Sequence, residues 1–410
     1  MARESKLEGQ ARSSRIGLAL AGGGPQGAIY EIGALRALDE VLEGVDFNDL
    51  YVYVGVSAGA FIAANLANDL TTAQMCRAIV KQEPGEHPFV SETFFVPASR
   101  ELLRRGATVP KLLLEALWRY AQNPRDHSLL DSLTSLTRAL PVGVFNNDRL
   151  REYLEKIYTI KGRTDDFRQL GKHLVVVAAD LDSGEAVRFG EPGFDQVPIS
   201  VAVQASSALP GLYPPVEIDG RHYVDGVLLK TIHGSVALEA GAKLLICLNP
   251  LVPVDTSKAV AEGVMRRGKL IDRGLPTVLS QSLRTLIRSR LEAGLSSYEK
   301  SFPDSDVVLF EPRRDDYEMF FNNVFSFSSR RTICEHAYLT TRRQLRERQE
   351  ELAPIFARHG IRLRTDLLVD DGAADLWCGV GLQRKPADRT VLGDLERVLG
   401  RLEGILETGP

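Results

Sequence analysis

Two short apolar runs near the start of the chain each lead into glycine and are each followed by a helical pattern. The runs are residues 16–21 and 51–55, and both are typical of buried strands. Apolar residues recur at helical spacing through 26–42, and residues 58–68 predict a second helix. Strand, helix, strand and helix in this order indicate a mainly parallel sheet with helices on its faces. We therefore expect an α/β fold.

The rest of the chain is predicted to add strands to this sheet, together with helical regions. Further strands are predicted at 174–179, 186–189, 216–218, 244–248 and 307–312, and further helices at 198–207, 330–350 and 389–404. The predicted domains are a disordered leader at 1–13, a main α/β domain at 14–320 and a helical C-terminal extension at 321–410. Within the main domain we expect a helical insertion at 71–170 and lid or interfacial helices at 255–300.

The composition argues against several classes of protein. The chain has 410 residues and a formal net charge of −4, so it lacks the basic excess of a general nucleic-acid binder. Its start is charged, and no apolar run reaches the roughly 18 residues that a membrane-spanning helix needs. The four cysteines lie far apart and form neither a metal-binding pair nor a disulfide framework. These features favour a reducing, cytoplasmic compartment and predict no bound metal.

The first predicted strand runs into the glycine loop Gly22-Gly23-Gly24-Pro25-Gln26-Gly27. Glycines let bare backbone approach a ligand, and the N–H groups at a helix start attract negative charge. One candidate anion is the pyrophosphate of a dinucleotide, because the loop also fits G-x-G-x-x-G. The other is the oxyanion of a tetrahedral acyl intermediate. The loop alone does not decide between the two.

The second predicted strand ends in Gly55-Val56-Ser57-Ala58-Gly59, a G-x-S-x-G motif between a strand and a helix. In this context small neighbours allow the tight turn that lifts a nucleophilic serine hydroxyl above a sheet edge. A dinucleotide-binding domain leaves Ser57 unexplained, whereas acyl chemistry uses both the serine and the glycine loop. The pattern therefore favours a serine acyl hydrolase, and dinucleotide binding ranks last.

A nucleophilic serine needs a base that accepts its proton. No histidine after Ser57 stands in a convincing strand-to-loop position that follows a suitable acid. Asp225 stands where the short apolar run Tyr223-Val224 reaches Gly226, so its carboxylate should emerge at a strand end. A carboxylate can act as the base if a partly apolar setting raises its pKa. An Asp-Gly pair alone is usually only a turn, so its surroundings carry the assignment.

The glycine loop, the serine elbow and the later Asp-Gly pair, in this order, resemble the patatin-like phospholipase family. Other segments are similar to the family too, namely Ala205-Ser206-Ser207-Ala208-Leu209-Pro210-Gly211, Tyr213-Pro214-Pro215-Val216 and Ala179-Asp180-Leu181-Asp182-Ser183-Gly184. The resemblance covers about residues 14–250.

The resemblance implies a three-layer α/β/α fold and a catalytic dyad without histidine, in which Ser57 attacks the ester and Asp225 is the base. It implies an oxyanion hole formed by Gly22, Gly23 and Gly24. It also implies supporting roles for the motif glycines Gly27, Gly55, Gly59 and Gly226. It implies hydrolysis of phospholipids, lysophospholipids, triacylglycerols or other fatty acyl esters through an acyl-enzyme, with no cofactor or metal. Acyl transfer by the same dyad and a catalytically silent lipid-binding regulator are the alternatives.

Three departures from the family pattern lie near the expected site. Gln26 stands where the family usually has arginine or lysine, and Val227 replaces the usual second glycine or alanine after the aspartate. Thr231 and His233 replace the asparagine and proline that often follow. Because both dyad residues and all three loop glycines remain, we expect activity, with a substrate preference that differs from that of a typical member.

Two further segments have more than one interpretation. Residues 265–290 hold seven basic residues against one acidic residue, with leucines on one helical face. They predict either an interfacial helix that contacts anionic lipid or an ordinary surface helix. The phenylalanine-rich segment 320–327 predicts an acyl-chain groove, an active-site lid or core packing. The expected partners are a lipid or fatty acyl ester and, peripherally, a membrane, with no nucleic acid.

Overall fold

The computed structural model describes residues 15–82, 96–98, 103, 107–122, 141–261, 263, 266, 268–272, 274–316, 327–369 and 375–381. The chain divides into two compact units, residues 1–371 and 372–410. The sheet and the helices around it belong to the first unit. In the second unit the short helix α17 (Leu376–Gly379) is described.

The helices and strands expected around the two glycine motifs are confirmed. The described strands are β1 (Ile16–Leu20), β2 (Leu42–Glu43), β3 (Val52–Gly55), β4 (Val96–Pro97), β5 (Phe145–Asn146), β6 (Leu174–Asp180), β7 (Ala186–Phe189), β8 (Val216–Ile218), β9 (Arg221–Asp225), β10 (Leu244–Leu248), β11 (Asp306–Phe310) and β12 (Arg362–Leu363). The described helices are α2 (Gly24–Val41), α3 (Ala58–Ala67), α4 (Thr72–Met75), η1 (Cys76–Lys81), α6 (Val109–Gln122), α8 (Asp148–Tyr158), α9 (Ile199–Ser206), η4 (Gly226–Leu228), α10 (Gly234–Glu239), α11 (Ser257–Ala261), α12 (Lys269–Asp272), α13 (Leu275–Ser301), α15 (Phe327–Glu347), α16 (Gln349–Arg358) and η5 (Thr365–Leu368).

An eight-stranded sheet forms the centre of the first unit, with the strand order β11-β10-β1-β3-β6-β9-β8 and with β7 paired to β6. The strands from β11 to β6 pair in parallel, whereas β7, β8 and β9 pair antiparallel to their neighbours. This sheet confirms the predicted α/β fold class. Because β1 and β3 are parallel neighbours, the glycine loop and the serine elbow follow them at the same end of the sheet.

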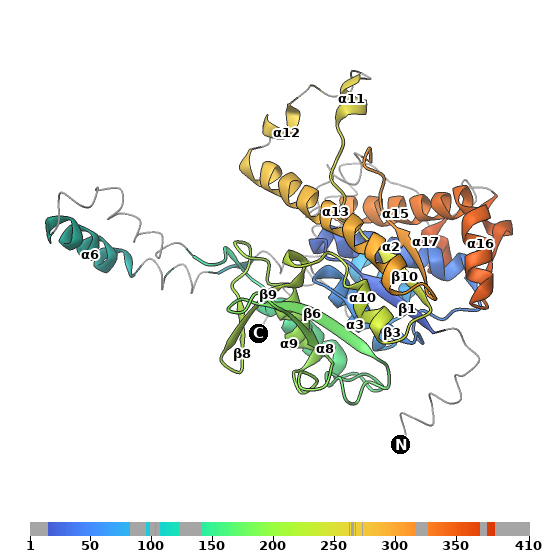
Figure 1. Ribbon diagram of the computed structural model, residues 1–410, viewed down its shortest axis with the longest axis horizontal. Helices are drawn as coiled ribbons and strands as arrows, with labels where there is room; N and C mark the ends of the chain where they lie inside the picture. The colour runs from blue at the N-terminus through green and yellow to red at the C-terminus, as the bar shows by residue number, and fades with distance from the viewer. Residues whose placement is uncertain are drawn as a thin grey trace, which may run out of the picture. The chain divides into compact units, whose positions relative to one another are not determined.

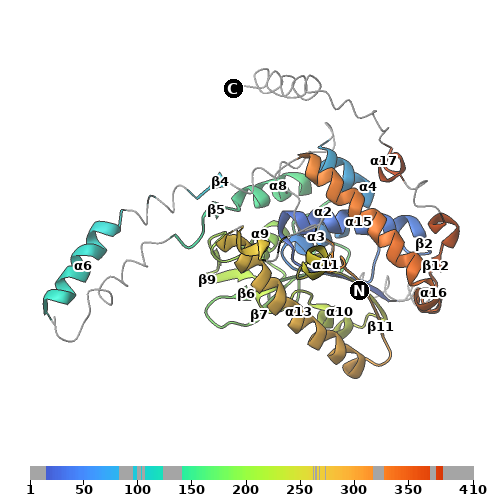
Figure 2. The same cartoon turned by 90° about the horizontal axis from the view of Figure 1, so that it is seen from above.

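Helices cover both faces of the sheet, which gives the expected three layers. Figures 1 and 2 show α2, α3 and α15 on one side of the strands and α10 and α13 on the other. Alternate strand residues form one buried cluster with α10 and α13: Ala19, Val52, Val54, Val175, Val177, Leu245 and Cys247. This alternation reflects the period of two residues along a strand. The core therefore holds the strand ends in place beneath the two glycine motifs.

The helix α15 packs along α2, whose first turn follows the glycine loop (Figure 2). A Cβ atom at Gly33 of α2 would lie 2.2 Å from the carbonyl oxygen of Cys334 in α15, so glycine permits this close approach. The Tyr338 hydroxyl of α15 also donates a 2.5 Å hydrogen bond to the Glu40 carboxylate of α2. Residues 327–369 belong to the same compact unit as the sheet, while the domain boundaries expected from the sequence stay predictions.

Several sequence-based expectations fall outside the described residues. They are the leader at 1–13, the segment 320–326 and the helix expected at 389–404. The described part of the expected insertion at 71–170 contains α4, η1, α6 and α8 and the short antiparallel pair of β4 and β5. None of the helices in the described residues combines the length and the hydropathy that a membrane span requires.

Candidate active site

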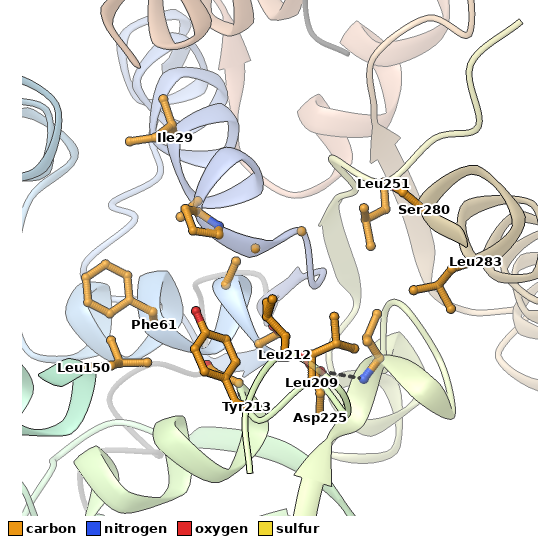
Figure 3. Close-up of a pocket in the computed structure, with 18 of the residues that line it drawn as sticks. Ile29, Phe61, Leu150, Leu209, Leu212, Tyr213, Asp225, Leu251, Ser280 and Leu283 are labelled. Atoms are coloured by element: carbon orange, nitrogen blue, oxygen red, sulfur yellow. Dashed lines mark hydrogen bonds between the residues drawn. The ribbon is translucent and has the colours of Figure 1, made fainter. Parts of the chain in front are cut away.

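A cavity of about 230 Å³ lies where the glycine loop, the serine elbow and the end of β9 meet (Figure 3). Figure 3 shows Phe61 and Leu150 on one side of this cavity and Ser280 and Leu283 on the other, with Asp225 between them. Most of its lining side chains are apolar: Ile29, Phe61, Ile79, Leu150, Leu209, Leu212, Tyr213, Leu251, Leu283 and Ile287 are examples. A mainly apolar cavity with a few polar groups fits an acyl ligand.

Ser57 occupies the sharp turn between β3 and α3, and its side chain lines the cavity. Its backbone has φ 54° and ψ −120°, and a positive φ is uncommon and costly for a residue other than glycine. Two hydrogen bonds hold the turn. The Ser57 N–H donates to the Ser206 hydroxyl oxygen (2.8 Å), and the Ser206 hydroxyl donates to the Val177 carbonyl of β6 (2.6 Å). The structure thus places Ser57 in a strained strand-to-helix elbow.

The glycines on either side of this elbow are needed because backbone atoms approach them closely. A Cβ atom at Gly55 would lie 2.4 Å from the α3 backbone, and one at Gly59 would lie 2.4 Å from the carbonyl oxygen of Leu20. At Gly226, which follows the candidate base, a Cβ atom would lie 2.5 Å from the Val177 carbonyl oxygen. Larger residues at these positions would push the elbow and the base away from the sheet.

The strands β3 and β9 lie end to end along the same edge of β6. Gly55 at the end of β3 pairs with Val176, and Asp225 at the end of β9 pairs with Ala178. The strand β7 pairs with both β6 residues, and therefore occupies the opposite edge. Because β3 runs parallel to β6 and β9 runs antiparallel, their carboxyl ends point at each other, about 7 Å apart along β6. This register brings Ser57 and Asp225 together from distant parts of the sequence.

The Asp225 carboxylate is buried beside the cavity and is 2% exposed. It accepts a 2.9 Å hydrogen bond from the N–H of Val227, and the Ser57 hydroxyl lies close enough to favour its ionised form. Burial raises the pKa of Asp225 to about 7, and the contacts with Val227 and Ser57 oppose part of this rise. A carboxyl group with this pKa is partly ionised at neutral pH and can exchange a proton with the serine.

Gly23 and Gly24 line the cavity beside the elbow, together with Ala58 at the first position of α3. Gly24 has φ +59°, which glycine adopts without strain. Gly22 is not among the lining residues, and its N–H donates to the Thr231 carbonyl at 3.4 Å. The structure therefore brings two of the three predicted loop glycines to the cavity. The start of α3 joins them there, and its N–H groups favour negative charge.

Of the residues that depart from the family pattern, Val227 and His233 lie near Asp225. Val227 lines the cavity, and its N–H donates to the Asp225 carboxylate. His233 is buried with Nε2 3.5 Å from the carbonyl oxygen of Gly226, and burial lowers the pKa of His233 to about 4, so it is uncharged at neutral pH. Gln26 and Gly27 lie in the first turn of α2 and are not among the lining residues.

The donor set of the cavity does not suit a metal ion. Among its lining residues the structure places one carboxylate, that of Asp225, and neither histidine nor cysteine. A magnesium or calcium site needs more oxygen ligands, and a zinc site needs nitrogen or sulfur ligands as well. In the described part of the chain, no three histidine, cysteine, aspartate or glutamate side chains gather to hold a metal.

Three polar residues at the site were not assigned a role from the sequence. Ser206 lies in one of the family-like segments, but no local pattern indicates that it anchors the elbow. Arg284 of α13 lines the cavity, whereas the sequence indicates only a basic helix there. Arg330 of α15 also lines the cavity, and no motif marks it. Each of the three reaches the site by a long-range contact, which leaves no local sequence signal.

The comparisons with solved structures give distant likenesses. The chain is similar to VipD from Legionella pneumophila, with 15% identity, a TM-score of 0.35, and coverage of 96% of this chain and 87% of VipD. It is also similar to the type III effector ExoU, with 15% identity, a TM-score of 0.34, and coverage of 83% of this chain and 54% of ExoU. The match to ExoU in complex with SpcU from Pseudomonas aeruginosa has 15% identity and a TM-score of 0.28, and it covers 94% of this chain and 73% of that one.

The comparison with sequence families is more informative. The family described as patatin-like phospholipase matches residues 18–233, just over half of the chain. This range contains the glycine loop, the serine elbow, the Ser206 anchor and the end of β9, so it covers the part of the cavity around Ser57 and Asp225. The chain belongs to the patatin-like phospholipase family.

Proposed function

We propose that this protein is a lipid acyl hydrolase of the phospholipase A, lysophospholipase or lipase type, with Ser57 as the nucleophile and Asp225 as its base. One observation carries the proposal: a buried carboxyl group with a pKa of about 7 lies next to the hydroxyl of a serine on a strained elbow. Membership of the patatin-like phospholipase family supports lipid hydrolase activity in general.

In the first half-reaction, the Ser57 oxygen attacks the ester carbonyl carbon while its proton passes to Asp225. Gly23 and Gly24 line the cavity with Ala58 at the start of α3, and their N–H groups would stabilise the oxyanion. When the tetrahedral intermediate collapses, the bond between the carbonyl carbon and the alcohol oxygen breaks. Asp225 then returns its proton to the departing alkoxide, and the acyl group stays on Ser57 as an ester.

In the second half-reaction, water attacks the acyl-enzyme and gives a proton to Asp225. Collapse of this intermediate breaks the bond to the Ser57 oxygen, which takes the proton back from Asp225. The fatty acid leaves and the enzyme is restored. An alcohol in place of water would give a new ester, so the same dyad would then perform acyl transfer.

We also propose that α12 and α13 contact the lipid surface. Large apolar side chains project from these helices into solvent, with exposures of 72% for Ile271, 68% for Leu275, 58% for Leu279 and 63% for Leu286. Another face of α13 lines the cavity, so a membrane bound to the exposed face of this helix would lie next to the site. Exposed apolar residues of this kind insert into the interfacial region of a bilayer.

Hydrolysis of a short-chain p-nitrophenyl ester tests the proposed dyad. Ser57→Ala should lower kcat by about 10³-fold or more, because the nucleophile is lost. Ser183→Ala is a matched control in the exposed turn between β6 and β7, and should keep the wild-type rate. Wild-type turnover by the Ser57→Ala protein would contradict the proposal. Product analysis with added glycerol separates hydrolysis from acyl transfer.

A further inference from the structure

A single peptide group lies between Asp225 and the imidazole of His233. The N–H of this group, that of Val227, donates to the Asp225 carboxylate at 2.9 Å. Its carbonyl oxygen, that of Gly226, lies 3.5 Å from Nε2 of His233. A carbonyl oxygen only accepts hydrogen bonds, so Nε2 is the donor in this contact. The Gly226–Val227 peptide group therefore connects the imidazole to the candidate base through two hydrogen bonds.

The imidazole of His233 keeps one protonation state around neutral pH. It is buried, and this burial lowers the pKa of His233 to about 4, while the charges of Lys230 and Arg188 lower it further. A neutral imidazole carries one N–H, and the contact with the Gly226 carbonyl favours the tautomer with the proton on Nε2. His233 is therefore an uncharged donor over the pH range in which Asp225 titrates.

His233 differs from the other donors to the Gly226 carbonyl in where it is anchored. The N–H groups of Leu229 and Lys230 also donate to this carbonyl, at 3.1 and 3.3 Å. Both belong to the turn that begins with η4, so they move together with the carbonyl. His233 is the residue before α10, and α10 packs against β1 and β3. The imidazole therefore ties the turn after Asp225 to a helix that is packed on the sheet.

A donor on the carbonyl side of a peptide group also affects the N–H side. Hydrogen bonds in a chain polarise one another, so a bond to the Gly226 carbonyl makes the Val227 N–H a stronger donor. A stronger donor to a carboxylate favours the ionised form and fixes its direction. His233 is not among the residues that line the cavity, so it would act on the base without touching the substrate.

We propose that His233 is a positioning residue of the dyad: its Nε2–H holds the Gly226–Val227 peptide group, and this group holds the Asp225 carboxylate toward Ser57. The inference rests on the proposed acyl hydrolase function, because it assigns His233 a role toward the base of that reaction. Proline, which the family often has at this position, lacks a side-chain donor. The family pattern therefore does not supply this contact.

The pH dependence of p-nitrophenyl butyrate hydrolysis tests the proposal. His233→Leu and His233→Phe both remove the donor, and two side chains of different shape guard against a variant that does not fold. Each should raise the apparent pKa of the base in kcat/KM by about 0.3–0.6 pH unit, because the Val227 N–H becomes a weaker donor. Each should also lower kcat about 3- to 10-fold and leave KM within about twofold of wild type, because His233 does not line the cavity.

His233→Gln should restore the wild-type pKa and kcat, because the glutamine amide nitrogen can take the place of Nε2 as donor. His222→Leu is the matched control, since His222 is an exposed residue of β9, and it should change neither value. The titratable and charged groups on neighbouring elements are Tyr213, Arg284 and Arg330 around the cavity, and Arg188 and Lys230 near His233. All of them are common to the compared proteins.

A lower kcat with an unmoved pKa in the Leu and Phe variants would indicate a structural role only and overturn the proposal, as would a Gln variant that behaves like them. An infrared titration of the Asp225 carboxyl band, assigned by its loss in Asp225→Asn, measures the same shift without catalysis. If the band shifts in His233→Leu but the wild-type protein hydrolyses no ester, the contact between His233 and Asp225 is supported and the proposed function is contradicted.

Discussion

Replacing Asp225 with asparagine removes a buried titrating group with little change in size. In the folded protein, burial raises the pKa of this carboxyl from 3.8 to about 7. In the unfolded chain, the same group ionises near its ordinary value. The folded state therefore binds the proton more tightly. The favourable contribution of the protonated carboxyl group to stability is complete below about pH 4 and is lost as the pH rises through 7.

The magnitude follows from the difference between the two pKa values. Each pH unit of that difference corresponds to about 1.4 kcal/mol, so the ionised carboxylate costs about 4 kcal/mol of unfolding free energy above pH 7. The Asp225→Asn variant has no such titration. Its unfolding free energy relative to wild type should therefore increase by about 3 kcal/mol between pH 5 and pH 8.

Urea unfolding of both proteins at several pH values between 5 and 8 measures this difference, because the other titrating groups are common to both. The Asp225→Asn protein should gain stability at pH 8 while it loses ester hydrolysis, as expected where function requires a destabilising group. If the difference in unfolding free energy between the two proteins is independent of pH, or shrinks as the pH rises, Asp225 does not act as a buried carboxyl group with a raised pKa.

Three further changes test other parts of the site. Gly59→Ala should cost about 1–3 kcal/mol in urea unfolding because its Cβ meets the β1 backbone, whereas Gly171→Ala, with open space around it, should cost less than about 0.5 kcal/mol. Ser206→Ala should lower stability by about 1–3 kcal/mol and also lower kcat because the elbow loses its anchor, whereas Ser200→Ala on the same helix should lower stability alone. Leu279→Asp should slow vesicle hydrolysis about tenfold or more and spare a monomeric short-chain ester, since this exposed side chain is proposed to enter the membrane. Equal losses of stability in the two glycine variants would contradict the first expectation, and an unchanged kcat in Ser206→Ala would contradict the second. Equal losses of activity on vesicles and on the monomeric ester would contradict the third.

The opening of the fold could be predicted because its signals are local. Apolar runs of strand length, helical periodicity and glycine at the two turns lie within residues 16–68, and each β–α unit has its own local pattern. The need for Gly55 and Gly59 also follows from the motif, since a helix that starts directly after a strand leaves no room for a side chain. These features depend on neighbours in sequence, which the sequence shows directly.

The position of Asp225 close to Ser57 could be predicted only in part. The pattern around Asp225 indicates a carboxylate at a strand end, but it does not reveal that β9 runs antiparallel to β6. That direction makes β9 meet β3 end to end, with Asp225 and Gly55 opposite Ala178 and Val176. Strand direction and edge are set by pairing between strands that lie far apart in the sequence, and no local pattern reports them.

The packing of α15 on α2 could not be predicted, for the same reason. The sequence predicts a helix at 330–350 but does not show where it packs, and the structure places α15 along α2 at Gly33. A glycine inside a helical pattern is a weak sign of such contact, because it also occurs in exposed helices. Arg330 reaches the cavity through this packing, so its place at the site could not be read from the sequence.

The reaction of Ser57 with a fluorophosphonate, followed by mass spectrometry across a pH series, tests the dyad most directly. We predict a single adduct on Ser57, with a rate that rises as Asp225 ionises and levels off above about pH 7. In the Asp225→Asn protein, labelling should be slow and should lose this pH dependence. An adduct on another residue, or a wild-type rate and pH profile in the Asp225→Asn protein, would contradict the account.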